Sequence, residues 1–229
     1  MPADVQPGRI WVTRALPQAE ATAARLRALG LEPVVAPVLE IRPVTGAAVD
    51  LGGVDALAFT SAAGISAFAA LCDRRDLTVF AVGDATADTA RAAGFTDVRS
   101  AGGDVLALAD LIAAAAPGLV LNPTAAEPAA DLPVLLAARG GAARAVVVYE
   151  TRETALETAP ANLAGVLIHS AKAARAVARL LAGADLSAVA AYAISPSAAV
   201  PLASLGVCDI TIAPSPNESA LLDLLRPAP

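Results

Sequence analysis

The sequence predicts an α/β fold made of two similar, doubly wound parallel-sheet domains. Three observations lead there: short apolar runs without polar alternation, alanine-rich helical segments between them, and a repeat of this pattern after about 110 residues. Runs such as Val79–Val82 and Val166–Ile168 are typical of strands buried on both faces of a parallel sheet. Their alternation with helical segments predicts layers of helices on each sheet.

The repeat extends over most of the chain. Ser61 and Ser170 hold the same place in it, between a short apolar strand and an alanine-rich helix. Three further pairs of segments correspond in the same order: Val79–Ala87 with Ala191–Ala199, Ala93–Val98 with Leu205–Ile210, and Leu108–Ile112 with Leu221–Leu225. A period this long indicates an internal duplication of a domain, because solenoid repeats are much shorter.

The beginning of each copy has the same plan. Strand Ile10–Val12, a helix to Gly30 and a strand over Val34–Ile41 correspond to strand Leu119–Leu121, a helix to Gly140 and a strand over Ala145–Thr151. Glycine just after a helix commonly adopts positive φ and ends it. We expect this of Gly30, Gly94, Gly140 and Gly206.

Composition excludes several classes of protein. The net charge is −6 without a basic patch, which argues against nucleic-acid binding. No apolar stretch is long enough to span a bilayer, and Met1–Gln6 lacks the pattern of a signal peptide. We therefore expect a cytoplasmic protein without membrane contact. Cys72 and Cys208 are expected to be buried, reduced thiols.

Metal and nucleotide sites are not expected. Two cysteines and the single His169 are too few for a zinc site, and no phosphate-binding glycine loop is present. His169 lacks a G-x-S-x-G elbow or a second base, so we interpret it as a residue at a strand end near the site and not as a catalyst.

Small polar residues recur where strands are expected to end and helices to begin. They are Thr13, Thr60, Ser61, Thr86, Asn122, Thr124, Ser170, Ser195 and Ser197. Helix capping explains any one of them. The whole set, on two matching domains, predicts a surface of hydroxyl and backbone N–H donors that binds carboxylates or phosphates.

Five motifs carry a resemblance to a known family. They are Val12-Thr13-Arg14 with Gln18, Glu20 and Leu29-Gly30; Phe59-Thr60-Ser61-Ala62 with Phe68; Ala81–Ala87; Val148–Thr151; and Ala193–Ser197. In order and spacing, over residues 8 to 225, they resemble the uroporphyrinogen-III synthase family. The chain departs from the family's pattern at Asn122-Pro123, where Arg-Gly is common, and at Ser195, where glycine is usual.

The resemblance implies a particular domain organisation. Residues 1–38 and 152–229 would form one discontinuous domain and residues 40–148 the other. A two-stranded connector near residues 37–43 and 149–153 would act as a hinge beside a cleft. Leu39 and Tyr149 fall at equivalent places in the repeat, in agreement with this plan.

The resemblance also implies a reaction, used in heme, siroheme and cobalamin biosynthesis. Hydroxymethylbilane, a linear tetrapyrrole, would lose water and close to uroporphyrinogen III with its last pyrrole ring inverted and without a cofactor. The pyrrole nitrogen pushes the hydroxyl out, so the protein mainly positions the substituted carbon of the last ring for attack through a spiro intermediate. A site without His, Cys or paired carboxylates suits such chemistry.

The family's pattern assigns roles to particular residues. Tyr149 would donate a proton or hydrogen bond to the departing hydroxyl, although a core tyrosine is the alternative. Thr86 matches a family threonine; its repeat partner is Ala198, for which Ser197 substitutes. The expected substrate-binding residues are Thr13, Arg14, Thr60, Ser61, Ala62, Thr86, Asn122, Ser170, Ala171, Lys172, Ser195, Ser197 and Ala198.

Two alternatives stay open beside a monomeric synthase. One is a non-catalytic relative that binds a tetrapyrrole and has a regulatory role. The chain ends at Pro229 soon after its last expected helix, so a DNA-binding domain fused to it is not expected. The other is a hinged small-ligand binding protein of the periplasmic type, against which the missing signal peptide counts. The acidic net charge does not exclude a polycarboxylate substrate, because screening limits its field to about 8 Å.

Overall fold

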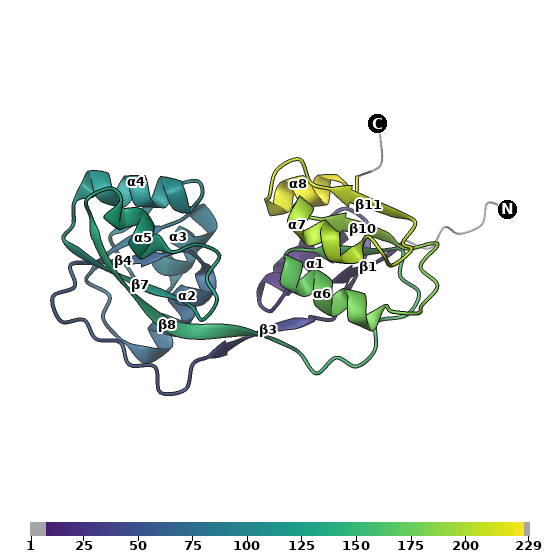
Figure 1. The fold of residues 1–229 in the computed structure, drawn as a ribbon, viewed down its shortest axis with the longest axis horizontal. Helices are drawn as coiled ribbons and strands as arrows, with labels where there is room; N and C mark the ends of the chain where they lie inside the picture. Colours follow the sequence, from purple (N-terminus) through teal and green to yellow (C-terminus); the bar gives the residue numbers. More distant parts are fainter. Residues whose placement is uncertain (1–7, 227–229) are drawn as a thin grey trace. The chain divides into compact units, whose positions relative to one another are not determined.

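The computed structural model describes residues 8–226, which form two compact units (Figure 1). The first contains the described residues up to Glu40 together with those from Arg152 onward, and the second contains Ile41–Thr151. Met1–Gln6, where no signal peptide is expected, and Pro229 lie outside the described residues.

The first unit contains a five-stranded sheet in the order β11-β10-β9-β1-β2, with every pair parallel. Its strands are β1 (Arg9–Val12), β2 (Glu32–Val35), β9 (Gly165–Ile168), β10 (Ala190–Ala193) and β11 (Asp209–Ile212). Its helices are α1 (Gln18–Ala28), α6 (Ala171–Leu180), α7 (Pro196–Ala199), the 3-10 helix η1 (Val200–Leu202) and α8 (Glu218–Asp223).

The second unit contains a six-stranded sheet in the order β3-β8-β7-β4-β5-β6, in which β8 to β6 are parallel neighbours. Its strands are β3 (Leu39–Pro43), β4 (Ala56–Phe59), β5 (Thr78–Ala81), β6 (Val98–Ser100), β7 (Leu119–Ala125) and β8 (Ala142–Glu153). Its helices are α2 (Ala62–Leu71), α3 (Asp84–Ala92), α4 (Val105–Ala115) and α5 (Leu132–Ala137). The boundary between the units falls within β3 and β8.

Helices pack on both faces of each sheet. In β1, Ile10 and Val12 pack with Leu26 of α1, whereas Trp11 between them packs with Val177 of α6. In the second unit, Phe59 packs with α2 and α3, whereas Phe80 packs with α4 and α5. Strands buried on both faces explain the continuous apolar runs. The predicted α/β class with parallel sheets is confirmed.

Two expected strand boundaries are wrong. The strand expected over Val34–Ile41 is two strands, β2 and β3, separated at Pro37, which has no N–H to donate to a ladder. The strand expected to end at Leu121 continues to Ala125. Its pairing with β4 ends at Leu121, but pairing with β8 continues, so Pro123 is tolerated on the side where no ladder bond is needed.

Details of the chain's surface and helix ends also bear on the predictions. Both cysteines are free thiols. Their predicted burial is wrong, because Cys72 is half-buried and Cys208, in the loop before β11, is exposed. The four glycines expected to end helices all have positive φ, as predicted. Within residues 8–226, no helix combines the length and apolar character needed to cross a membrane.

Candidate active site

Each sheet has a point where its strand order reverses. In the second unit, β4 leads to β5 and β6 on one side, and the chain returns to β7 on the other. In the first unit, β1 leads to β2 and the chain returns to β9. Open parallel sheets bind ligands at such switch points, beyond the carboxyl ends of the strands. Thr60 and Ser61 follow β4, Thr13 and Arg14 follow β1, and Ser170 follows shortly after β9.

A pocket of about 460 Å³ lies at the switch point of the second unit. Its lining residues are Thr60, Ser61, Val82, Val105, Thr124, Ala125, Glu127, Pro128, Ala129, Ala130, Tyr149 and Thr151. The volume is within the range of roughly 300–1,000 Å³ that small-molecule sites occupy. A second pocket of about 290 Å³ lies at the opposite ends of β7 and β8, but its one charged group, Arg139, already pairs with Asp110. The first pocket is therefore the candidate active site.

Ser61 and Tyr149 form the polar centre of this pocket. Their hydroxyl oxygens are 2.8 Å apart. Ser61 also caps α2, because its Oγ accepts the N–H of Gly64 at 3.2 Å. A Cβ at Gly64 would lie 2.9 Å from the Pro123 carbonyl oxygen, so glycine allows the first turn of α2 to approach β7 this closely. The packing of α2 on β7 thus fixes Ser61 beside Tyr149.

An irregularity in the sheet sets the orientation of Tyr149. Thr124 of β7 pairs with Val147, whereas the next residue, Ala125, pairs with Tyr149, so Val148 is an extra residue in β8. Val148 and Tyr149 are consequently both buried, at 0% and 8% exposure, and pack with Ala67 of α2. Bulges of this kind often re-aim a side chain next to an active site.

Three predicted residues of the second unit, Ala62, Thr86 and Asn122, do not line the pocket. Thr86 is the third residue of α3, after the N-cap Gly83, and is 7% exposed. Asn122 lies inside β7 at 2% exposure, and its Nδ2 donates to the Ala58 carbonyl oxygen at 2.8 Å. Asn122 therefore ties β7 to β4. Ala62, the first residue of α2, stands next to Ser61.

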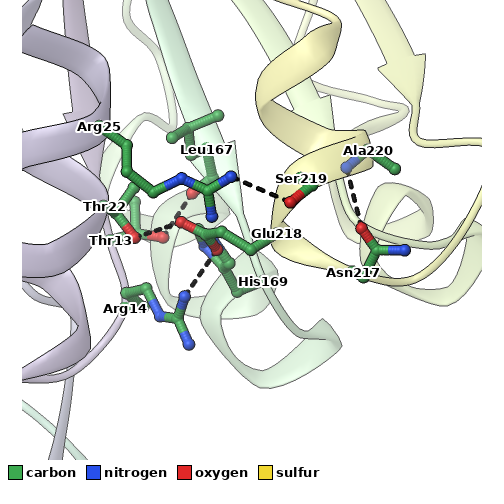
Figure 2. A network of polar contacts seen from close by, with 10 residues as sticks. All are labelled: Thr13, Arg14, Thr22, Arg25, Leu167, His169, Asn217, Glu218, Ser219 and Ala220. Atoms are coloured by element: carbon green, nitrogen blue, oxygen red, sulfur yellow. Dashed lines mark hydrogen bonds and ion pairs between the residues drawn. The ribbon is translucent and has the colours of Figure 1, made fainter. Parts of the chain in front are cut away.

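At the switch point of the first unit, a polar network surrounds Glu218 (Figure 2). The carboxylate of Glu218 accepts hydrogen bonds from Arg14 Nη1 at 2.7 Å, His169 Nε2 at 2.8 Å and Thr22 Oγ1 at 2.5 Å. The buried Thr13 hydroxyl donates to the Leu167 carbonyl oxygen at 2.6 Å, which joins the ends of β1 and β9. Arg14 is thus paired within the protein.

The network determines the charge of its members. Burial would raise the pKa of Glu218, but the hydrogen bond from His169, the attraction to its protonated imidazole, the hydrogen bond from Thr22 and the charge of Arg14 outweigh it and lower the pKa to about 2. Burial lowers the pKa of His169, against the opposing effect of Glu218. His169 is therefore neutral at pH 7 and carries its proton on Nε2, because a carboxylate only accepts. Its buried Nδ1 has no hydrogen-bond partner among the described residues.

The other predicted residues of the first unit lie at helix starts. Ser170 caps α6, with its Oγ accepting the Ala173 N–H at 3.1 Å, and Ala171 and Lys172 follow in the first turn. Ser195 precedes α7, and its hydroxyl lies 3.0 Å from that of Ser197. Ala198 is fully buried in α7.

Sequence reasoning missed several residues of these two regions, among them Val105 and Glu127 in the pocket, and Thr22 and Glu218 in the network. Glu218 is one of many acidic residues, so its type alone gave no signal. The repeat offered one, because Glu218 stands at the position that Val105 holds in the other copy. A carboxylate in place of an apolar residue at the first position of a helix could have indicated a polar partner.

Comparison with known proteins decides the family. The family model described as "Uroporphyrinogen-III synthase HemD" matches residues 20–223. The chain belongs to the uroporphyrinogen-III synthase family. The resemblance inferred from the motifs is confirmed, and with it the function: this uroporphyrinogen-III synthase is a lyase of tetrapyrrole biosynthesis that acts on a tetrapyrrole substrate.

Solved structures add evidence on the fold. A uroporphyrinogen-III synthetase from Helicobacter pylori is 19% identical, with a TM-score of 0.66 over 96% of this chain and 98% of that one. A mutant uroporphyrinogen III synthase from Thermus thermophilus is 17% identical, with a TM-score of 0.50 over 96% and 97% of the two chains. At these identities the likeness shows the fold alone. No curated protein sequence matches the chain.

Proposed function

We propose that this synthase carries out its reaction at the pocket of the second unit, with Tyr149 as the proton donor and Ser61 as the group that orients it. The observation that supports this assignment is the 2.8 Å contact between their hydroxyl oxygens in a pocket at the switch point. Tyr149 lies in the motif that resembles the family's tyrosine segment.

Either hydroxyl of the Ser61–Tyr149 pair can donate to the other, and the proposal takes Ser61 as the donor. Its oxygen accepts the Gly64 N–H, and its own proton is available for the Tyr149 oxygen. With Ser61 as donor, the phenolic proton of Tyr149 is available for the hydroxyl of the substrate. The C–O bond of the hydroxymethyl group breaks, water leaves with that proton, and the pyrrole nitrogen supplies the electrons. The substituted carbon of the last ring then attacks the methylene carbon to give the spiro intermediate. Breaking of its original methylene bond and closure at the free carbon invert the ring, and the proton lost from that carbon restores Tyr149.

Substrate carboxylates are proposed to bind at helix starts in both units. Unpaired backbone N–H groups at the first turns of α2 and α6 favour anions. The proposed contacts are Thr13, Arg14, Thr60, Ser61, Ala62, Thr86, Asn122, Ser170, Ala171, Lys172, Ser195, Ser197 and Ala198. The burial of Thr13, Thr86, Asn122 and Ala198 makes any contribution from them indirect, through the backbone.

We further propose that the two units are duplicated domains, residues 1–38 with 152–229 and residues 40–148, connected by β3 and β8. The repeated order of strands and helices supports the duplication, and both sheets have their switch point between equivalent strands, β9 and β1 in the first unit and β4 and β7 in the second. The protein is proposed to act as a cytoplasmic monomer, without a cofactor and without a nucleic-acid partner.

The test is an assay with freshly made hydroxymethylbilane, in which oxidised type III and type I products are separated by chromatography. The wild type is expected to give type III. Tyr149→Phe is expected to lower kcat about 100-fold, because a positioned general acid contributes roughly 10²–10⁴. Tyr192→Phe, the same change on β10, serves as the control and should match the wild type.

Either part of the proposal can fail on its own. Type I product alone, at the uncatalysed rate, would show that the chain binds its tetrapyrrole without directing closure. Type III product from Tyr149→Phe at the wild-type rate would remove the role of Tyr149 and leave the synthase activity in place.

A further inference from the structure

The carboxylate of Glu218 joins segments of the first unit that lie far apart in the sequence. Glu218 begins α8, Arg14 follows β1, Thr22 lies on α1 and His169 follows β9 (Figure 2). Because β1 and β9 are neighbours at the switch point, the two loops that leave their carboxyl ends are held by one side chain.

The network is well shielded from water. The side chains of Glu218, Arg14 and His169 are 21%, 29% and 8% exposed. Three donors converge on the two carboxylate oxygens, which offer about four acceptor positions. An amide in this place would keep one oxygen toward Arg14 and His169, but its NH₂ group would have to donate to the Thr22 hydroxyl, and it would carry no charge. Only the carboxylate accepts from all three donors and balances the charge of Arg14.

The segments that Glu218 holds carry proposed substrate contacts. Arg14 and Thr13 form the loop after β1. His169 directly precedes Ser170, whose hydroxyl caps α6 by accepting the Ala173 N–H. Movement of His169 would move the first turn of α6, whose N–H groups are proposed to bind carboxylates. We infer that Glu218 is a positioning residue for substrate binding, acting through Arg14 and His169; the inference rests on the proposed function.

A role in stability alone is the competing explanation, and steady-state kinetics separates the two. Glu218→Gln keeps the size of the side chain but removes the charge and one acceptor. If Glu218 positions the binding segments, KM for hydroxymethylbilane should rise about tenfold while kcat stays within about twofold, as expected for loss of binding shared by ground and transition states. Measurements are made at a temperature where the variant is fully folded by circular dichroism.

Asp223→Asn is the matched control. Asp223 is on the same short helix and pairs with Arg226 at 3.0 Å, but its side chain is 59% exposed. It should keep the KM of the wild type. A Glu218→Gln protein with unchanged KM and only a lower Tm would overturn the inference, as would an equal rise in KM for Asp223→Asn.

A gentler pair of variants covers the case in which Glu218→Gln does not fold. Thr22→Val removes one hydrogen bond to Glu218 and leaves every proposed substrate contact in place, whereas Thr22→Ser keeps the hydroxyl. We expect KM to rise about threefold in Thr22→Val and to return to the wild-type value in Thr22→Ser. Equal KM in both variants would overturn the inference.

These outcomes are distinct from a failure of the proposed function. If the wild type forms type III and the Glu218 and Thr22 variants bind normally, only the positioning role falls. If the wild type forms type I alone, both the proposed function and the positioning role fall.

Discussion

The switch points of the two sheets share a topology but contain different chemistry. In the second unit, Val105, the first residue of α4, lines a pocket of about 460 Å³. In the first unit, Glu218, the first residue of α8, fills the corresponding place with a network to Arg14, Thr22 and His169. The comparison associates a carboxylate at the start of this helix with a closed polar network, and an apolar residue there with an open pocket.

The network and the pocket differ in the free energy that burial of their polar groups requires. Charged groups lose hydration when they are buried, so the Glu218 network needs good geometry to be stable at all. The pocket keeps Ser61 and Tyr149 satisfied by each other without any buried charge between them. We therefore expect the first unit to depend on pH and charge, and the second to depend on the shape and polarity of its pocket.

The largest expected effect is on acid stability. The pKa of Glu218 is about 2 in the folded protein against an ordinary value of 4.5. A lowered carboxyl pKa gives stability that is present above about pH 4.5 and lost as the pH falls toward about 2, here about 3 kcal/mol. Urea unfolding of wild type and Glu218→Gln across this range should show their difference in unfolding free energy shrinking with acid. A constant difference would contradict the assignment.

The next largest effect is expected from a carboxylate introduced into the pocket. Val105→Glu would make the second switch point resemble the first, but without a designed partner for the charge. Because the substrate is a polycarboxylate and like charges repel by several kcal/mol, we expect kcat/KM to fall about 100-fold. Leu106→Glu places the same charge on the next residue, which is 48% exposed, and should have little effect. Equal losses in both variants would show that the pocket is not the site.

Removal of the Ser61 hydroxyl should have a smaller effect on the rate. Ser61→Ala deletes the partner of Tyr149 and the cap of α2, so we expect kcat to fall about tenfold and the free energy of unfolding by about 1 kcal/mol. Ser61→Thr keeps the hydroxyl and should recover most of the lost kcat and most of the lost free energy of unfolding. Loss of stability with normal kcat would limit Ser61 to capping.

The smallest expected effect is at the exposed ion pair of α8. Asp223→Asn breaks the contact with Arg226, but exposed pairs contribute little. We expect a change of less than about 0.5 kcal/mol in the free energy of unfolding by urea. A change as large as that of Glu218→Gln would mean that α8 responds to any loss of charge, and the contrast between buried and exposed pairs would disappear.

Part of the site follows from sequence motifs. Thr60, Ser61 and Tyr149 stand in segments that resemble the family, and the structure places all three in one pocket. Asn122 is a residue whose position the sequence motifs did not predict. The apolar run before it suggested a strand end, but pairing with β8 extends β7 to Ala125 and buries the amide against Ala58. Strand ends depend on a neighbour that is distant in sequence, so local patterns do not fix them.

The sequence by itself determined the α/β class and the family, because apolar runs, helix stops and motif order are local properties of the chain. Only the tertiary structure decided that Arg14 pairs with Glu218, about 200 residues away, and is not a bare cation at the strand end. It also decided that an extra residue in β8 brings Tyr149 to Ser61. Both contacts depend on which strands become neighbours, and that choice is made by the packing of the whole sheet.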